Sequence, residues 1–115
     1  MSGLYFKYGT MNSSKTANLL MAKHNYEEQG FNVILLKPDT DTRSIKVTSR
    51  VGLSSDCIGI SPYADVREII KNECDNRHDT ISNVVIMVDE AQFLTPVQVN
   101  DLYALSFKNV VMCYG

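Results

Sequence analysis

Two short stretches of the sequence carry residue types that together can handle a nucleoside triphosphate. The first is GTMNSSKT at residues 9–16, which approaches the phosphate-loop pattern G-x-x-x-x-G-K-[ST]. In such a loop, backbone N–H groups and the start of the next helix surround the phosphates. Lys15 would reach the outer phosphates, and the Thr16 hydroxyl would hold Mg²⁺. The pattern has a glycine where this chain has Ser14, but serine is small and can cap a helix, so we expect the loop to form.

The second stretch is Asp89-Glu90, which directly follows the apolar run VVIMV at residues 84–88. An apolar strand ending in aspartate is the second half of a phosphate-loop site, where the carboxylate holds Mg²⁺. Glu90 is placed to act as general base on an attacking hydroxyl or water. Each stretch also has a structural alternative, namely an ordinary polar turn or an acidic helix cap. Their occurrence together and in this order predicts nucleotide binding.

Two arginines, Arg43 and Arg50, lie in the polar segment that follows residue 37. An arginine there could bind the transferring phosphate through two parallel hydrogen bonds, or it could be a solvated surface charge. Asp41 could orient Arg43 through a short ion pair. Arg43 is therefore the stronger candidate of the two.

Apolar periodicity predicts the elements that would position these residues. Strands are expected at residues 4–8, 31–37, 57–60, 84–88 and 109–113, with a further short strand possible at 47–49 and loops over most of 39–56. Helices are expected at residues 14–29, at 61–75 and from 95 to about 106.

Local signals support the three helices. Ala17, Leu20, Met21 and His24 share one face of the first helix. Ser61-Pro62 resembles an N-cap followed by proline, and Val66, Ile69, Ile70 and Cys74 form the apolar stripe of the second helix. Thr95 and Gln98 form a capping box at the start of the third.

The order of these elements predicts an α/β fold of the P-loop NTPase kind, with a mainly parallel sheet and helices on both faces. Ligands of such sheets bind at the carboxyl ends of the strands. The phosphate loop, the segment after Lys37 and the Asp89-Glu90 turn all emerge at that edge.

Length and composition limit the kinds of protein that this chain can be. The 115 residues predict one domain, with 44% apolar and 21% charged residues, as in ordinary globular proteins. A net charge of −2 and the absence of a basic stripe argue against nucleic acid as the partner. There is no membrane-spanning run or signal-peptide pattern, so we expect a cytoplasmic protein. The three cysteines, far apart in sequence, are expected to be buried thiols rather than disulfide or zinc ligands.

Five sequence segments occur in this order: GTMNSSKT, LLKPDTDTR, SRVGLSSD, VDEAQFLTPVQV and VVMCYG. In these segments, the chain resembles the thymidine kinases of the cytosolic, tetrameric type (type II). The resemblance covers essentially all 115 residues, and KPDTDTR and VDEAQFL are its most specific parts. It implies transfer of the ATP γ-phosphate to thymidine in DNA precursor synthesis by a homotetramer. The chain would supply the nucleotide-binding portion.

The resemblance also implies roles for individual residues. Glu90 would be the general base, Thr16 and Asp89 would hold Mg²⁺, and Arg43 would act at the donor-phosphate side within the Asp41-Thr42-Arg43 triplet. Thymidine would contact Met11, Phe93 and Asp41. The nucleotide would be bound by Gly9, Thr10, Met11, Asn12, Ser13, Ser14, Lys15, Thr16, Asp89, Glu90, Ala91 and Gln92.

The family's zinc-binding subdomain and the lasso loop over thymine follow the point at which this sequence ends. Structural Zn²⁺ is therefore expected only in that part, and no zinc ligand is expected among these 115 residues. Two alternatives stay open. One is an ATPase of the recombination or motor type, in which Glu90 would activate water; the other is a non-catalytic nucleotide-binding module.

Overall fold

The computed structural model describes residues 3–7, 12–39, 44–48, 54–77 and 84–115. Within them, six strands form one sheet in the order β1-β6-β5-β2-β4-β3. Five neighbouring strands run parallel, and β3 pairs antiparallel with β4 at one edge. The strands are β1 (Gly3–Lys7), β2 (Asn32–Pro38), β3 (Ser44–Thr48), β4 (Ser54–Ile60), β5 (Val84–Val88) and β6 (Val110–Tyr114). This arrangement confirms the predicted α/β fold with a mainly parallel sheet.

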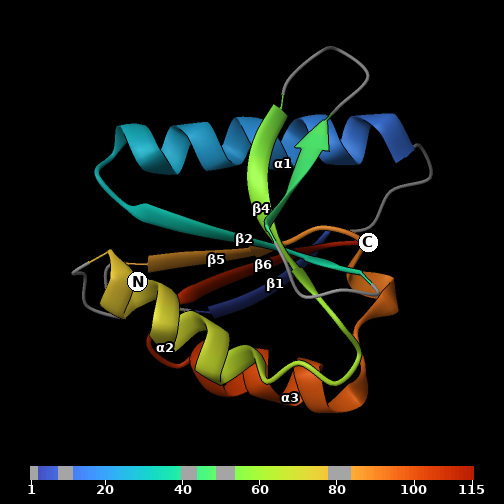
Figure 1. Ribbon diagram of the computed structural model, residues 1–115. Helices are drawn as coiled ribbons and strands as arrows, with labels where there is room; N and C mark the ends of the chain where they lie inside the picture. Colours follow the sequence, from blue (N-terminus) through green and yellow to red (C-terminus); the bar gives the residue numbers. More distant parts are fainter. Residues whose placement is uncertain (1–2, 8–11, 40–43, 49–53, 78–83) are drawn as a thin grey trace.

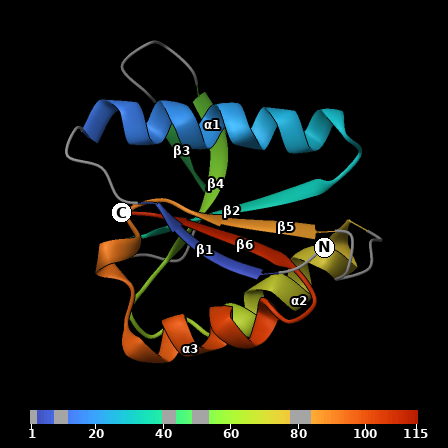
Figure 2. The same ribbon diagram turned by 180° about the vertical axis from the view of Figure 1, so that it is seen from behind.

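Helices cover both faces of the sheet, also as predicted. Helix α1 (Asn12–Glu28) packs on one face, and helices α2 (Val66–Asn76) and α3 (Pro96–Leu105) pack on the other (Figures 1 and 2). Each face has its own cluster of buried apolar side chains. All five residues of β5 are buried, because this strand lies inside the sheet and is covered on both sides.

The start of α3 agrees with the sequence, whereas the start of α2 does not. Thr95 forms the predicted capping box with Gln98. The N-cap of α2 is Asp65, whose side chain accepts the Glu68 N–H at 3.2 Å, so the expected start at Ser61-Pro62 is wrong. Residues 61–64 instead form a turn, closed by a hydrogen bond from the Ala64 N–H to the Ser61 carbonyl. The apolar stripe predicted for α2 is confirmed, since Val66, Ile70 and Cys74 are buried.

Helix α1 begins at Asn12, two residues earlier than predicted, and its buried face differs from the expected one. Leu19 and Leu20 are buried against the sheet, whereas Met21 is 56% exposed and His24 is exposed. The apolar residues of this helix surround much of its axis, so periodicity alone was ambiguous. Packing against β2, β5 and β6 selects the face that carries Leu19.

Part of the segment expected to be a loop forms β3 and the start of β4. The strand predicted at residues 57–60 is confirmed as the end of β4, and the short strand considered possible at 47–49 overlaps the end of β3. β3 covers residues 44–48, and β4 begins at Ser54 rather than at Cys57. β3 pairs only with β4 among the described strands and lies at the edge of the sheet, where a polar sequence such as SIKVT is acceptable. A strand of this kind lacks the apolar run by which the other strands were recognised.

Strand register brings the ends of the parallel strands to one edge of the sheet. Leu36 of β2 is level with Val88 of β5, Val88 with Cys113 of β6, and Lys7 of β1 with Tyr114. The carboxyl ends of β1, β6, β5 and β2 therefore lie side by side at this edge. The predicted functional residues come from the segments that follow these ends.

The three cysteines are buried, as predicted. Burial raises the pKa of Cys57 to about 11 and that of Cys113 to about 12, so both thiols are protonated at neutral pH. Among the described helices, none combines the length and apolar character needed to cross a lipid bilayer.

Candidate functional site

A small pocket at the carboxyl edge of the sheet unites residues from distant parts of the chain. The N-terminal part of α1 supplies Lys15 and Thr16, and the segment after β5 supplies Asp89 and Glu90. The complete lining is Lys15, Thr16, Asp89, Glu90, Gln92, Tyr114 and Gly115. The structure thus brings together the lysine, the hydroxyl and both carboxylates that the sequence singled out.

Asp89 is a buried carboxylate held by backbone hydrogen bonds. Its side chain is only 5% exposed, its N–H donates to the Leu36 carbonyl at 2.9 Å, and its Oδ1 accepts the Glu90 N–H at 3.0 Å. Burial raises the pKa of the Asp89 carboxyl, and the charge of Glu90 adds to this rise. The Glu90 N–H and the positive charges of Lys37 and Lys15 act in the opposite direction. In the described residues, the Glu90 N–H uses only Oδ1 of this carboxylate.

Glu90 has an unusual backbone conformation. Its φ of 55° and ψ of 41° place it in the left-handed region, the only such non-glycine residue in the described part of the chain. This conformation is uncommon for a residue with a side chain, and strain of this kind is concentrated at functional sites. The sharp turn leads into the 3-10 helix η2 (Ala91–Phe93), and the Gln92 Nε2 donates to Glu90 Oε2 at 2.8 Å. The Glu90 carboxylate is therefore oriented beside Asp89.

The raised pKa of Asp89 predicts a gain in stability when its charge is removed. Between the ordinary carboxyl pKa and the raised value, the folded protein binds the proton more tightly than the unfolded chain does, so stability falls as the pH rises. The Asp89→Asn substitution keeps the acceptor for the Glu90 N–H but has no charge. We expect it to stabilise the protein at neutral pH and thus to raise its melting temperature.

The measurement is thermal unfolding of both proteins without nucleotide or divalent cations, at several pH values. The advantage of Asp89→Asn should shrink as the pH falls towards about 4, the ordinary range for a carboxyl group. A wild-type protein that is as stable as the variant at neutral pH would show that burial of Asp89 is not the dominant effect.

Several predicted site residues cannot be placed in this pocket. Gly9, Thr10, Met11, Asp41, Thr42, Arg43 and Arg50 lie outside the described residues. Residues 12–14 form the first turn of α1. Ala91 is buried in the apolar cluster beneath α2 and α3 and does not line the pocket. The predicted roles of these residues stay predictions.

Phe93 lines a second, apolar cavity near the first. Its ring is 67% exposed, and the cavity has a volume of about 400 Å³. The lining residues are Pro38, Asp39, Ile60, Pro62, Phe93 and Gln98. The turn that carries Glu90 also carries Phe93, so one segment borders both the polar pocket and the apolar cavity.

Sequence reasoning missed three residues at this edge. Tyr114 and Gly115 line the pocket with Lys15, and Lys37 lies near enough to lower the pKa of Asp89. Each is at or next to the carboxyl end of a parallel strand. The rule that ligands bind at this edge could have indicated them once strand neighbours were known, but β6 was not paired with β1 from sequence.

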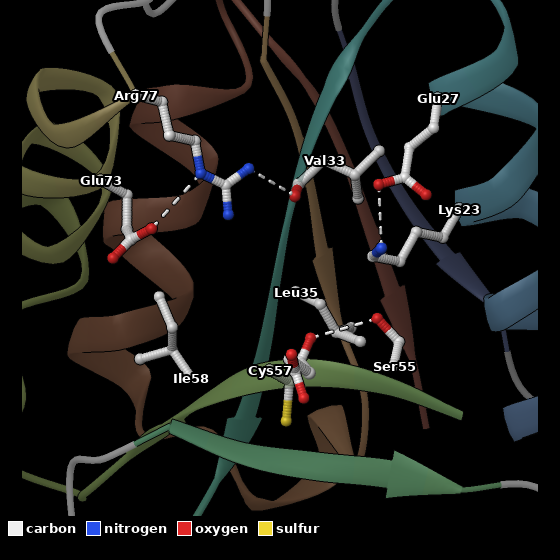
Figure 3. A pocket seen from close by; sticks show the side chains of 10 residues that line it. Lys23, Glu27, Val33, Leu35, Ser55, Cys57, Ile58, Glu73 and Arg77 are labelled. Carbon is white, nitrogen blue, oxygen red and sulfur yellow. Dashed lines mark hydrogen bonds and ion pairs between the residues drawn. The ribbon is translucent and has the colours of Figure 1, made fainter.

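A third pocket lies away from these residues, where β4 diverges from β2. β4 pairs with β2 only at Leu36–Pro38. The carbonyl of Val33, which lies before this paired part of β2, accepts a hydrogen bond from Arg77 Nη1 at 3.0 Å. The resulting cavity of about 270 Å³ contains Lys23 paired with Glu27 and Arg77 paired with Glu73 (Figure 3). Because both cations have a carboxylate partner, this pocket has no net positive charge to attract a phosphate.

The sequence is similar to known proteins over most or all of its length. The family model described as "Thymidine kinase" matches residues 2–115. The thymidine kinase of Photorhabdus laumondii is 36% identical over 119 residues, an alignment that covers 100% of this chain and 57% of that protein. The thymidine kinase of Rhodopirellula baltica is 40% identical over 104 residues, covering 89% of this chain and 47% of the relative. The enzyme of Enterobacteria phage T4 is 39% identical over 119 residues, covering 100% and 60%. The chain thus spans about half the length of these relatives.

Proposed function

The chain belongs to the thymidine kinase family, and from this membership we propose that it is the nucleotide-binding part of an ATP-dependent thymidine kinase. The reaction transfers the γ-phosphate of ATP to the 5′-hydroxyl of thymidine, giving thymidine monophosphate and ADP. The observation that carries the proposal, beside the family, is the pocket shared by Lys15, Thr16, Asp89 and Glu90. These are the groups that phosphoryl transfer requires, namely a cation for phosphate, oxygen ligands for Mg²⁺ and a base.

We assign the donor nucleotide to the Lys15 side of the pocket. The Lys15 ammonium contacts the outer phosphates, and residues 9–14 and the start of α1 surround the phosphate chain with backbone N–H groups. Asp89, Glu90 and Gln92 border the nucleotide from the opposite side, with Ala91 of the same turn buried in the apolar cluster. Arg43, with Asp41 and Thr42 beside it, neutralises charge on the transferring phosphate.

The oxygen atoms at this site fit Mg²⁺. The Thr16 hydroxyl and the Asp89 carboxylate line the same pocket, and Asp89 has one oxygen not used by the Glu90 N–H. Mg²⁺ is commonly bound by one or two such protein oxygens together with substrate phosphates and water. When bound, the ion supplies positive charge next to the phosphates. No cluster of three or more acidic, histidine or cysteine side chains that could hold a metal ion occurs in the described residues.

We assign thymidine to the Phe93 side of the turn. Glu90 accepts the proton of the 5′-hydroxyl as that oxygen attacks phosphorus, and its orientation is maintained by Gln92. Phe93, together with Met11 and Asp41, borders the base and sugar. We further propose a cytoplasmic homotetramer with structural Zn²⁺ outside these 115 residues, by resemblance to the family.

The test is ADP release by the purified full-length protein with ATP and Mg²⁺. Dependence on thymidine, with formation of thymidine monophosphate, supports the kinase. Stimulation by single-stranded DNA instead of thymidine supports the alternative ATPase. Nucleotide binding without turnover at saturating thymidine supports a non-catalytic module.

A further prediction concerns the serine in the phosphate loop. The Ser14→Gly substitution introduces the residue that the phosphate-loop pattern prefers, and glycine is smaller than serine. We expect unchanged or slightly tighter ATP binding in calorimetry. A several-fold loss of affinity would mean that the Ser14 hydroxyl itself contacts the nucleotide.

A further inference from the structure

The apolar cavity next to Glu90 has walls from three separate segments. Pro38 ends β2 and Asp39 follows it, Pro62 follows β4, and Phe93 follows β5. Gln98, in the first turn of α3, contributes a side chain that is only 2% exposed. A buried amide beside a cavity must have its donors and acceptors satisfied, so its hydrogen-bond partners show what it holds in place.

Both ends of the Gln98 amide are used, and they reach different segments. Oε1 accepts the Thr95 N–H at 3.1 Å, within the capping box of α3. Nε2 donates to the Ser61 carbonyl at 2.8 Å and more weakly to the Ala64 carbonyl at 3.4 Å. One side chain therefore joins the start of α3 to the turn that follows β4.

These two segments form two of the walls of the cavity. Thr95 follows the Phe93 turn, in which the Phe93 N–H donates to the Glu90 carbonyl at 3.1 Å. On the other side, Ser61 follows Ile60, whose carbonyl accepts the Asp39 N–H at 2.8 Å. A shift of the turn at residues 61–64 would therefore change the distance between Pro62 and Phe93 across the cavity.

We propose that Gln98 is a positioning residue for the acceptor nucleoside, which sets the width of the cavity by tying residues 61–64 to α3. This inference rests on the proposed function, since it takes the acceptor to be thymidine. Gln98 lies outside the pocket of Lys15 and Thr16. We call the hydrogen bond from Gln98 Nε2 to the Ser61 carbonyl the Gln98 tether. Its loss should weaken the binding of thymidine and leave the binding of ATP unchanged.

The principal variant is Gln98→Met, which has a similar length but neither donates to Ser61 nor accepts from Thr95. Loss of one hydrogen bond corresponds to about a two- to tenfold change in an equilibrium constant, and the Ser61 carbonyl still accepts the Ala64 N–H in this variant. In the full-length protein, we expect a rise of about five- to tenfold in KM for thymidine, with KM for ATP within twofold of wild type. The matched control is Thr95→Ala, which removes the capping hydroxyl but keeps the Gln98 tether and should leave both KM values unchanged.

A second variant distinguishes the effect of the hydrogen bond to Ser61 from that of the hydrogen bond to Thr95 in the helix cap. Gln98→Glu keeps an acceptor for the Thr95 N–H at any pH, and glutamate is a normal partner in a capping box. It can donate to the Ser61 carbonyl only when protonated, and burial raises the pKa of a carboxyl group above its ordinary range. The charged groups around this position are Asp39 in the same cavity and Asp65, Arg67 and Asp101 in the adjoining one. KM for thymidine, divided by the wild-type value at the same pH, should therefore rise with pH.

Amide hydrogen exchange at residues 61–65 supplies a readout that does not need activity. Gln98→Met should accelerate exchange there, and Thr95→Ala should not. Equal KM values for thymidine in Gln98→Met and wild type, parallel rises in both KM values, or a flat pH ratio for Gln98→Glu would each overturn the proposal. A wild-type protein that does not phosphorylate thymidine would refute the proposed function and this substrate, whereas unchanged exchange in an active Gln98→Met variant would refute the tether alone.

Discussion

Substitution of Glu90 by glutamine should lower kcat for thymidine phosphorylation by about 10²- to 10⁴-fold, the usual contribution of a positioned general base. Glutamine has the same shape and can still accept the hydrogen bond from Gln92 Nε2, which is 2.8 Å long in the wild-type protein. The left-handed backbone at residue 90 should therefore be retained. Only the proton acceptor is lost, so affinity for Mg·ATP should stay close to wild type.

The measurement combines steady-state kinetics with calorimetric titration of Mg·ATP on the full-length protein. Glu68→Gln, at an exposed carboxylate of α2, is the matched control and should retain full activity. Asp89→Asn is the contrasting variant, because loss of a Mg²⁺ ligand should weaken Mg²⁺-dependent nucleotide binding. Full thymidine phosphorylation by Glu90→Gln would refute the assignment of the base, and exchanged phenotypes would mean that the two carboxylates have the opposite roles.

Substitution of Lys15 by alanine should weaken ATP binding by about 10- to 100-fold, since hydrogen bonds to charged groups are the strong ones. Lys15 is half-buried in the first turn of α1 and shares its pocket with Asp89. Its charge lowers the pKa of the Asp89 carboxyl, so its removal also takes away a group that favours the ionised form of Asp89. Both effects act against binding of Mg·ATP.

Lys23→Ala is the matched control for Lys15→Ala, because Lys23 lies on the same helix and is paired with Glu27 at 3.0 Å, away from the pocket. Calorimetry should show wild-type ATP affinity for Lys23→Ala. Equal affinity in Lys15→Ala and wild type would mean that residues 9–16 are an ordinary turn before a helix rather than a phosphate loop.

The parts of the fold that sequence predicted well are those with strong local signals. The buried strand Val84–Val88 is continuously apolar, and Thr95 with Gln98 has the spacing of a capping box. The order of strands and helices then specifies the parallel sheet and its carboxyl edge. This is why Lys15 and Asp89 could be predicted to meet although they are far apart in sequence.

The errors arise where tertiary contacts decide among local options. Ser61-Pro62 has the sequence of a helix start, but the Ser61 carbonyl accepts a hydrogen bond from Gln98 and the helix begins after Asp65. The left-handed Glu90 has no sequence signal, because glycine would be the residue expected there. Such features depend on partners that are distant in sequence.

The position of β1 at the edge of the sheet has a consequence for how the protein folds. In the described residues β1 pairs only with β6, from Gly3 opposite Val110 to Lys7 opposite Tyr114, and the Gly115 N–H donates to the Lys7 carbonyl. β1, the first described strand, can therefore pair only after β6, the last described strand, has been synthesised. Pairing between segments so far apart in sequence is slow. During synthesis, β1 stays unpaired until residues 110–114 have left the ribosome. The pocket lined by Lys15 and Tyr114 is consequently assembled late, and if the proposed nucleotide binds there it should protect the β1–β6 ladder from local opening.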